Sequence, residues 1–121
     1  MNSAMNPWSE AERGVSPHPN DVDRKRIERA LAQRQRYRYV SPYVRKAADG
    51  YRIESPCCSR NVDQSGGVID IARLEYLDPC SAWRLYRKDH LRDQWVAEGE
   101  YTSLTAVLQR LNEDPQRLFW R

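Results

Sequence analysis

The amino-acid sequence predicts an α+β domain with an N-terminal helix, an antiparallel sheet of about five strands that is curled or closed into a small barrel, and a C-terminal helix. Apolar residues recur with helical spacing around residues 21–34 and again at 104–111. Between these stretches, segments rich in β-branched and aromatic residues alternate with short turn signals, as in a meander of strands. A chain of 121 residues fits one such domain, which we place at residues 20–121.

The N-terminal stretch, residues 1–19, has no sustained apolar period and carries three prolines, so we expect a disordered arm whose one strong anchor is Trp8. A helix should begin at Asn20 or Asp21, because either side chain can cap its first turn. Four residues share one face of this helix at i, i+3, i+4 and i+7: Ile27, Ala30, Leu31 and Arg34. The opposite face is mostly charged, so we expect the helix on the surface with its arginines directed outward.

Five strands are expected between the helices, at residues 36–46, 51–55, 68–77, 81–88 and 94–99. Pro42 places the first strand at an edge or a bulge, and a turn at residues 48–50 would pair it with the second. The apolar pattern of the third strand shifts phase between Ile71 and Leu74, which predicts a bulge near Ala72.

The final helix should begin after a cap at Thr102 or Ser103 and end at the pair formed by Asp114 and Pro115. Its apolar residues follow the helical spacing without exception: Leu104, Val107, Leu108 and Leu111. Three large apolar residues close the chain and should pack back on the sheet or close one of its ends: Leu118, Phe119 and Trp120.

The formal net charge of +3 hides an uneven distribution. Residues 24–52 carry ten lysines or arginines against Glu28 and Asp49, so this segment is strongly basic and the remainder of the chain is acidic. Seventeen of the twenty basic residues are arginine, whose planar group binds phosphate with two parallel hydrogen bonds and stacks on flat rings. A phosphate-bearing partner is therefore indicated. Two simpler origins of the charge stay open, because a GC-rich genome raises the arginine content everywhere and a run of charge is usually a solvated face.

Catalytic chemistry is not indicated. Of the two histidines, His18 lies between prolines in the arm and His90 lies in a turn among charged residues, so neither is expected to be a buried base. Cys57, Cys58 and Cys80 lack the C-x-x-C spacing of zinc sites, so we expect ordinary cysteines, no metal and no cofactor. The sequence therefore predicts a non-enzymatic protein.

No stretch of the chain approaches the roughly 18 to 20 apolar residues that cross a bilayer, and the N-terminus lacks the apolar segment of a signal peptide. The odd number of cysteines, two of them adjacent, is a poor disulfide framework. These features predict a cytoplasmic protein with reduced thiols and no membrane partner. They leave the oligomeric state open, a homodimer included.

Two segments of the chain could together hold an anionic nucleotide. The first, residues 34–38, offers several guanidinium groups for phosphates or guanine faces, and the second, residues 60–67, offers a carboxylate, a hydroxyl and glycine amides. The predicted ligand-binding residues are Arg34, Arg36, Arg38, Arg60, Asp63, Ser65 and Gly67. For the second segment an ordinary hairpin loop is the alternative, because turn residues dominate loops for conformational reasons alone.

Arg34 and Arg38, followed by Asp63, Ser65 and Gly67, resemble the two motifs of PilZ domains, although the second motif is one residue shorter here than in that family. The resemblance implies a small barrel with a terminal helix that binds cyclic-di-GMP. The C-terminal part, with WRLYRKDHLRDQW, a leucine-rich helix and the pairs Asp-Pro and Phe-Trp, is similar to small bacterial domains of unknown function. That similarity implies a compact bacterial module and no particular activity.

The leading hypothesis is a bacterial regulatory protein that binds the second messenger cyclic-di-GMP and relays this to a protein partner. The alternative is a nucleic-acid-binding regulator that uses the basic N-terminal helix and the predicted strand at residues 36–46, in which arginine and tyrosine alternate. Its arginines would bind phosphates and its tyrosines would stack on bases. A third hypothesis is an adaptor whose basic face meets an acidic protein, with the arm around Trp8 as a second contact.

Overall fold

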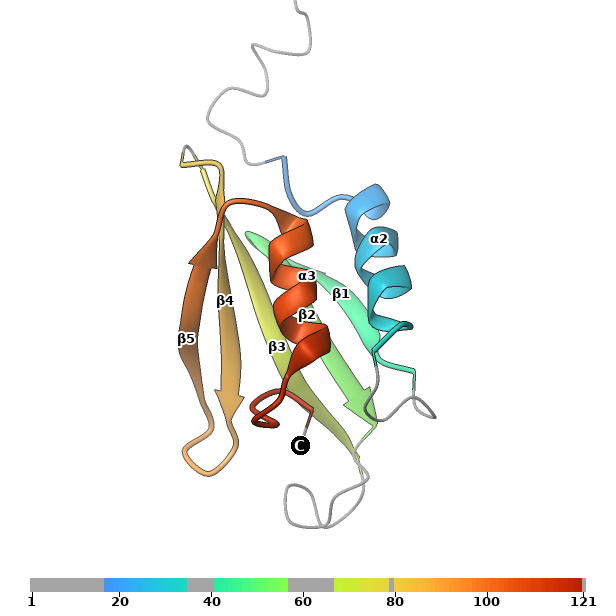
Figure 1. The fold of residues 1–121 in the computed structure, drawn as a ribbon, viewed down its shortest axis with the longest axis vertical. Coiled ribbons are helices and arrows are strands. Elements are labelled where there is room, and N and C mark those ends of the chain that lie inside the picture. The colour runs from blue at the N-terminus through green and yellow to red at the C-terminus, as the bar shows by residue number, and fades with distance from the viewer. Residues whose placement is uncertain (1–16, 35–40, 57–66, 79, 121) are drawn as a thin grey trace, which may run out of the picture.

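The computed structural model describes residues 17–34, 41–56, 67–78 and 80–120. Its elements are helix α2 (Asp21–Leu31), strands β1 (Tyr43–Ala47), β2 (Gly50–Pro56), β3 (Val68–Leu77), β4 (Ala82–Asp89) and β5 (Gln94–Tyr101), and helix α3 (Leu104–Glu113). This order of helix, strands and helix confirms the predicted α+β class (Figure 1). Within the ranges given above, no helix is long and apolar enough to span a membrane.

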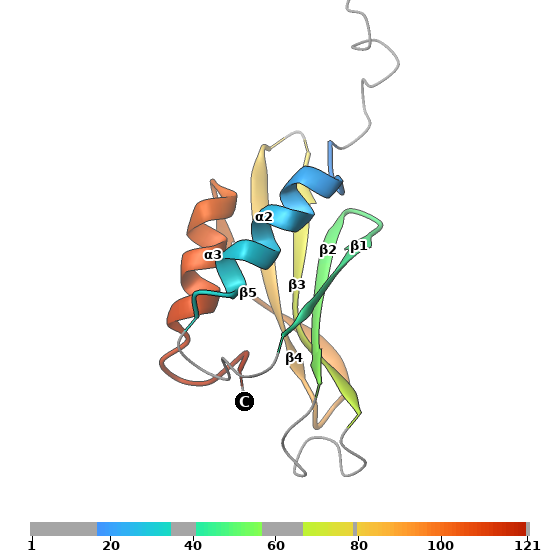
Figure 2. The same cartoon turned by 90° about the vertical axis from the view of Figure 1, so that its right-hand side faces the viewer.

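The strands form one antiparallel sheet in the order β1-β2-β3-β4-β5, and each strand pairs with its neighbour in the chain. For the part of the chain that the structure describes, β1 and β5 are the two edges, so the sheet is not closed and the small barrel is not formed. Both helices lie on the same face of the sheet, as Figure 2 shows, with α2 against β1 and α3, and α3 against β4 and β5.

Two bulges interrupt the strand pairing. Between β2 and β3 the register shifts after Ile53, which leaves Ile71 as the extra residue, next to Ala72 where the sequence predicts a bulge. Between β4 and β5 the register shifts after Leu85 and leaves Glu98 as the extra residue, a bulge that was not predicted. Bulges of this kind bend a strand and increase its local twist.

Both helices begin with predicted caps. The Oδ1 atom of Asn20 accepts a hydrogen bond from the backbone N–H of Asp23 at 2.7 Å, and the Oγ atom of Ser103 accepts one from Ala106 at 3.1 Å. Such a cap satisfies one of the backbone donors that the first turn leaves without a partner. Helix α2 ends at Leu31, so the last residue of its predicted apolar face, Arg34, lies beyond the helix.

The core lies between the helices and the sheet. Ile27 and Leu31 of α2 are fully buried. The four apolar residues predicted for α3 are at most 5% exposed: Leu104, Val107, Leu108 and Leu111. Phe119 and Trp120 join the same cluster, which confirms that the C-terminal residues pack back on the fold. Burial of each such large side chain stabilises the fold by about 1.5 to 3 kcal/mol relative to exposure.

A buried carboxylate holds the C-terminal segment in place. Asp114, which is fully buried, accepts hydrogen bonds from the backbone N–H groups of Leu118, Phe119 and Trp120 at 2.8, 3.0 and 2.8 Å. The indole Nε1 of Trp120 in turn donates to the carbonyl oxygen of Leu111 at 2.9 Å. The segment after α3 is thereby fixed against the end of that helix.

Candidate ligand-binding site

The sheet has two ends with different chemistry. At the first, which we call the His18 end, β2 begins, β3 ends and β4 begins, and Tyr76 pairs with Trp83. At the second, which we call the Gly67 end, β1 begins, β2 ends and β3 begins, and Tyr43 pairs with Glu54. Helix α2 starts near the His18 end and runs towards the Gly67 end (Figure 1).

Five of the predicted ligand-binding residues lie outside the described residues: Arg36, Arg38, Arg60, Asp63 and Ser65. Trp8, Cys57, Cys58 and the first part of the first predicted strand, residues 36–40, also lie outside them. The two predicted site residues that the structure describes are Arg34 and Gly67.

Arg34 is buried, with only 2% of the residue exposed. Its Nη1 donates to the carbonyl oxygen of Leu31 at 2.8 Å, and its guanidinium carbon lies 4.4 Å from the centre of the Trp120 ring. Burial lowers the pKa of this guanidinium, which still carries its charge at neutral pH because the ordinary pKa of arginine is so high. This burial agrees with the apolar spacing that placed Arg34 on the same face as Ile27 and Leu31. The predicted contact of Arg34 with a phosphate stays a prediction, for which the packed guanidinium presents little surface.

Described residues next to both predicted segments lie at the Gly67 end. The arginine segment runs from Arg34 to β1, whose first residue Tyr43 pairs with Glu54 near the end of β2. The second segment connects Pro56 with Gly67, and Pro56 pairs with the first residue of β3. The strand register therefore places the described residues that follow the first segment and those that flank the second segment at the same end of the sheet.

Part of the basic charge between residues 24 and 52 is neutralised on the surface. The Nε atom of Arg45 lies 2.6 Å from Oε1 of Glu54, and the Nζ atom of Lys46 lies 3.0 Å from Oδ1 of Asp21. The hydrogen bond and charge of Lys46 lower the pKa of the Asp21 carboxyl. Cations in such pairs are less available to an anionic ligand than their number in the sequence indicates.

The outward face of α2, unlike the pairs of Arg45 and Lys46, carries two exposed cations beside a cavity. Lys25, Glu28, Arg29 and Ala32 line an open cavity of about 460 Å³ there. Lys25 and Arg29 are both exposed, and neither was among the predicted site residues, although both belong to the basic segment. Their i, i+4 spacing, opposite the buried Ile27, is the signal that could have found them.

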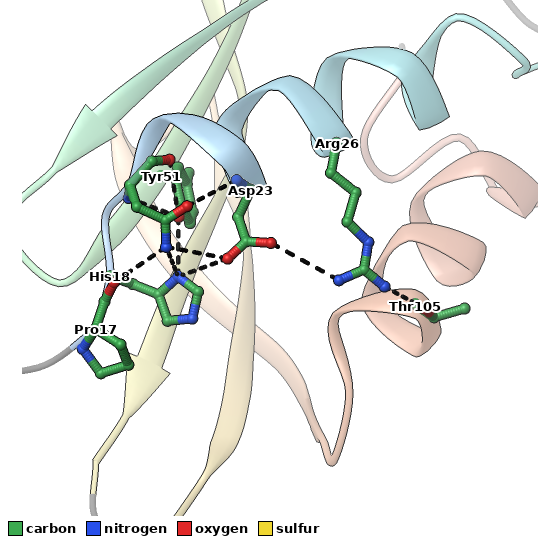
Figure 3. A network of polar contacts seen from close by, with 7 residues as sticks. Pro17, His18, Asp23, Arg26, Tyr51 and Thr105 are labelled. Atoms are coloured by element: carbon green, nitrogen blue, oxygen red, sulfur yellow. Dashed lines mark hydrogen bonds and ion pairs between the residues drawn. The ribbon is translucent and has the colours of Figure 1, made fainter.

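A polar network that the sequence did not predict lies at the His18 end (Figure 3). The Nδ1 atom of His18 is 2.9 Å from the hydroxyl of Tyr51 and 3.5 Å from Oδ2 of Asp23. Asp23 also lies 3.8 Å from Arg26, whose Nη2 donates to the hydroxyl of Thr105 on α3 at 2.7 Å. The network thus connects the segment before α2 with the sheet and with the second helix.

His18, at the end of the predicted arm, packs against the sheet. The ring of His18 packs on three aromatic rings, with centroid distances of 4.6 Å to Tyr76 and to Trp83 and 5.9 Å to Tyr51, and 11% of its side chain is exposed. Burial lowers the pKa of His18, an effect that the charge of Asp23 partly opposes, and burial raises the pKa of Tyr51. Composition alone cannot show the aromatic surface that this segment meets in the fold.

The face of the sheet away from the helices carries cations that are already engaged. Arg52 and Lys88 lie 5.6 and 4.9 Å from the centre of the Trp95 ring, and both contact Asp70, at 2.8 and 3.3 Å. Their charges are therefore shared between an aromatic ring and a carboxylate. We place the candidate site at the Gly67 end rather than on this face.

Two smaller predictions concern the histidine and cysteine at the turns. His90 lies in the connection between β4 and β5, as predicted, and Cys80 is an exposed free cysteine. Within the ranges that the structure describes, no three His, Cys, Asp or Glu side chains are grouped so that they could hold a metal ion.

One family of known proteins matches almost the whole of this fold. Residues 15–121 match the family described as a domain of unknown function, DUF3024. The match covers every helix and strand described above and agrees with the resemblance of the C-terminal part to small domains of unknown function. No curated protein and no solved structure matches the chain significantly.

Proposed function

This chain belongs to the DUF3024 family, and we propose that it is a non-enzymatic regulatory protein that binds a phosphate-bearing nucleotide, cyclic-di-GMP, at the Gly67 end of its sheet. It acts in the cytoplasm and relays ligand binding to a protein partner. The observation that supports the proposal is the strand register, because the pairs Tyr43 with Glu54 and Pro56 with Val68 bring residues next to both predicted segments to one end of the sheet.

In this proposal the ligand contacts come from both segments. Arg36, Arg38 and Arg60 bind phosphates or stack on guanines, since guanidinium groups do both. Asp63 and Ser65 form hydrogen bonds to base edges or phosphates, and Gly67 allows close approach of the backbone. The similarity of these residues to the motifs of PilZ domains supports cyclic-di-GMP as the ligand.

In this proposal Arg34 is a structural anchor rather than a contact to the ligand. Its stacking on Trp120 and its hydrogen bond to Leu31 fix the residue from which the arginine segment starts. A segment with a fixed start loses less conformational freedom when it closes on a ligand, which favours binding. Arg34 is therefore an anchor for the site.

The placement of His18 supports a non-enzymatic function. Its ring is enclosed by aromatic side chains, and its Nδ1 atom faces the hydroxyl of Tyr51. A general base must come within hydrogen-bonding reach of a substrate proton, and this histidine sits in the fold rather than at the proposed site.

Isothermal titration calorimetry with cyclic-di-GMP tests the proposal. We expect micromolar or tighter binding, weakened about tenfold or more by Arg38→Ala or Asp63→Ala, because hydrogen bonds to charged groups contribute about 1.5 to 3 kcal/mol. Arg84→Ala is the matched control, since Arg84 pairs with Glu100 at 2.6 Å and lies on the face away from the helices. Absence of heat with the wild-type protein would exclude this function.

A nucleic-acid strand is the second candidate, and the exposure of Tyr43 favours it. This side chain, 48% exposed, lies at the start of β1, where a base could stack on its ring. The exposed cations of α2 lie on the helix that packs against the same strand. Binding of a fluorescent single-stranded RNA should then weaken steeply as salt is raised, whereas an affinity that is absent at low salt or indifferent to salt contradicts this candidate.

A further inference from the structure

The outward face of α2 presents a cavity beside two cations. Lys25, Glu28, Arg29 and Ala32 are spaced i, i+3, i+4 and i+7, so they form one stripe along the helix. This stripe lines an open cavity of about 460 Å³. The opposite side of the helix, with Ile27, is buried in the core.

The cations of α2 fall into two groups. Arg24 contacts Asp21 and Glu28, at 3.6 and 3.0 Å, and so pairs with the acidic side chain among the described residues that line the cavity. Arg26 contacts Asp23 and Thr105, which turns it towards α3.

Lys25 and Arg29 form the second group. Among the residues that the structure describes, neither of them makes an ion pair, and both are exposed at the cavity. Side chains four residues apart on a helix have Cβ atoms about 5 to 6 Å apart. Two cations at this spacing can hold the two free oxygens of one phosphodiester, with the fork of Arg29 binding bidentately and Lys25 acting as a compact charge. Ala32, with its small side chain, leaves room beside them.

We infer that Lys25 and Arg29 form a further binding position for a phosphodiester group on the outward face of α2. The inference rests on the proposed function, because it takes the ligand to be phosphate-bearing. It adds two residues that precede both predicted segments, on a helix that leads directly into the arginine segment. The phosphodiester is that of a cyclic dinucleotide or of a nucleic-acid strand.

The test compares the double variant Lys25→Gln/Arg29→Gln with a control that loses the same charge, Arg26→Gln/Arg84→Gln. With cyclic-di-GMP, we expect the first variant to bind about tenfold more weakly than the wild type and the control to bind within about twofold of it. Thermal unfolding of each variant is measured alongside, because Arg29 lies in the last turn of α2 and also offsets the helix dipole. A lower melting temperature with unchanged affinity would assign Arg29 a structural role and overturn the inference.

A second arm identifies the source of the phosphodiester. If a single-stranded RNA is the ligand, loss of two phosphate contacts should reduce the slope of log affinity against log salt by about 1.4. A wild-type protein that binds neither probe overturns the proposed function and this inference together. A wild-type protein that binds, with a Lys25→Gln/Arg29→Gln variant that binds equally well, overturns the inference alone.

Discussion

The two ends of the sheet use polar side chains in opposite ways. At the His18 end, the polar groups satisfy one another: the hydroxyl of Tyr51 meets Nδ1 of His18 at 2.9 Å and accepts a hydrogen bond from the backbone N–H of Asn20 at 3.0 Å. At the Gly67 end, Arg34 is turned inward on Trp120, and the basic segment continues from it along the chain.

This difference separates a structural use of charge from a binding use. A buried polar group must find a partner inside the fold, because leaving it without one costs about 1 to 3 kcal/mol. An exposed cation that makes no ion pair among the described residues has no such requirement and can bind an anion. Arg34 and Arg29, five residues apart in the sequence, illustrate the two cases, one stacked in the core and the other exposed beside a cavity.

The largest expected effect comes from removing the ring at the Gly67 end. Trp120→Ala should lower the free energy of unfolding by about 4 kcal/mol, because it leaves a cavity in the core and takes away the surface on which Arg34 packs. Urea denaturation followed by circular dichroism measures this loss.

Trp95→Ala is the matched control, since Trp95 is only partly buried and lies on the face of the sheet away from the helices. We expect it to cost about 1 kcal/mol. Equal losses for the two tryptophans would show that Trp120 does not anchor the Gly67 end.

A smaller but sharp effect is expected at the His18 end, from Gly50. A Cβ atom on this residue would lie 1.9 Å from the carbonyl oxygen of Leu74, a backbone atom held by strand pairing. Gly50→Ala should therefore lower the free energy of unfolding by about 3 kcal/mol. In Gly99→Ala the new atom would meet the Tyr101 hydroxyl at 3.2 Å, and this side chain can move, so we expect a change of less than about 1 kcal/mol. A Gly50→Ala variant as stable as Gly99→Ala would contradict the close packing of β2 on β3.

Most of the fold could be predicted because its signals are local. The bounds of β3, the cap at Ser103 and the bulge beside Ala72 follow from apolar periodicity and side-chain hydrogen bonding within a few residues. Whether the sheet closes into a barrel depends on its total twist and on contacts between its edges, which no local pattern contains.

The sites were harder to predict because they depend on contacts between distant residues. His18 is ordered through Tyr51, Tyr76 and Trp83, all more than thirty residues away in the sequence. Arg34 follows the apolar spacing of α2, and that spacing correctly placed it on the buried side, but its residue type suggested a ligand contact instead. The residue type was misleading because an arginine can stack on a buried ring and keep its charge.

The smallest expected effect is a dependence of the free energy of unfolding on pH that originates at the His18 end. Burial lowers the pKa of His18 below its ordinary value of 6.5, while Asp23 partly opposes this, and the ring is otherwise surrounded by Tyr51, Tyr76 and Trp83. The unfolded chain therefore takes up a proton before the folded protein does. The contribution of neutral His18 to the free energy of unfolding should be fully present above about pH 7. It should decrease as the pH falls through 6.5 towards the lowered pKa of His18.

Urea denaturation between about pH 7.5 and pH 5.5, a range in which carboxylates stay ionised, measures this dependence. His18→Gln removes the titrating group, so its stability should change less with pH than that of the wild type. If His18→Gln kept the wild-type slope, the pH dependence of stability would not originate at His18, and the contrast between the two ends of the sheet would fail at the residue that defines it.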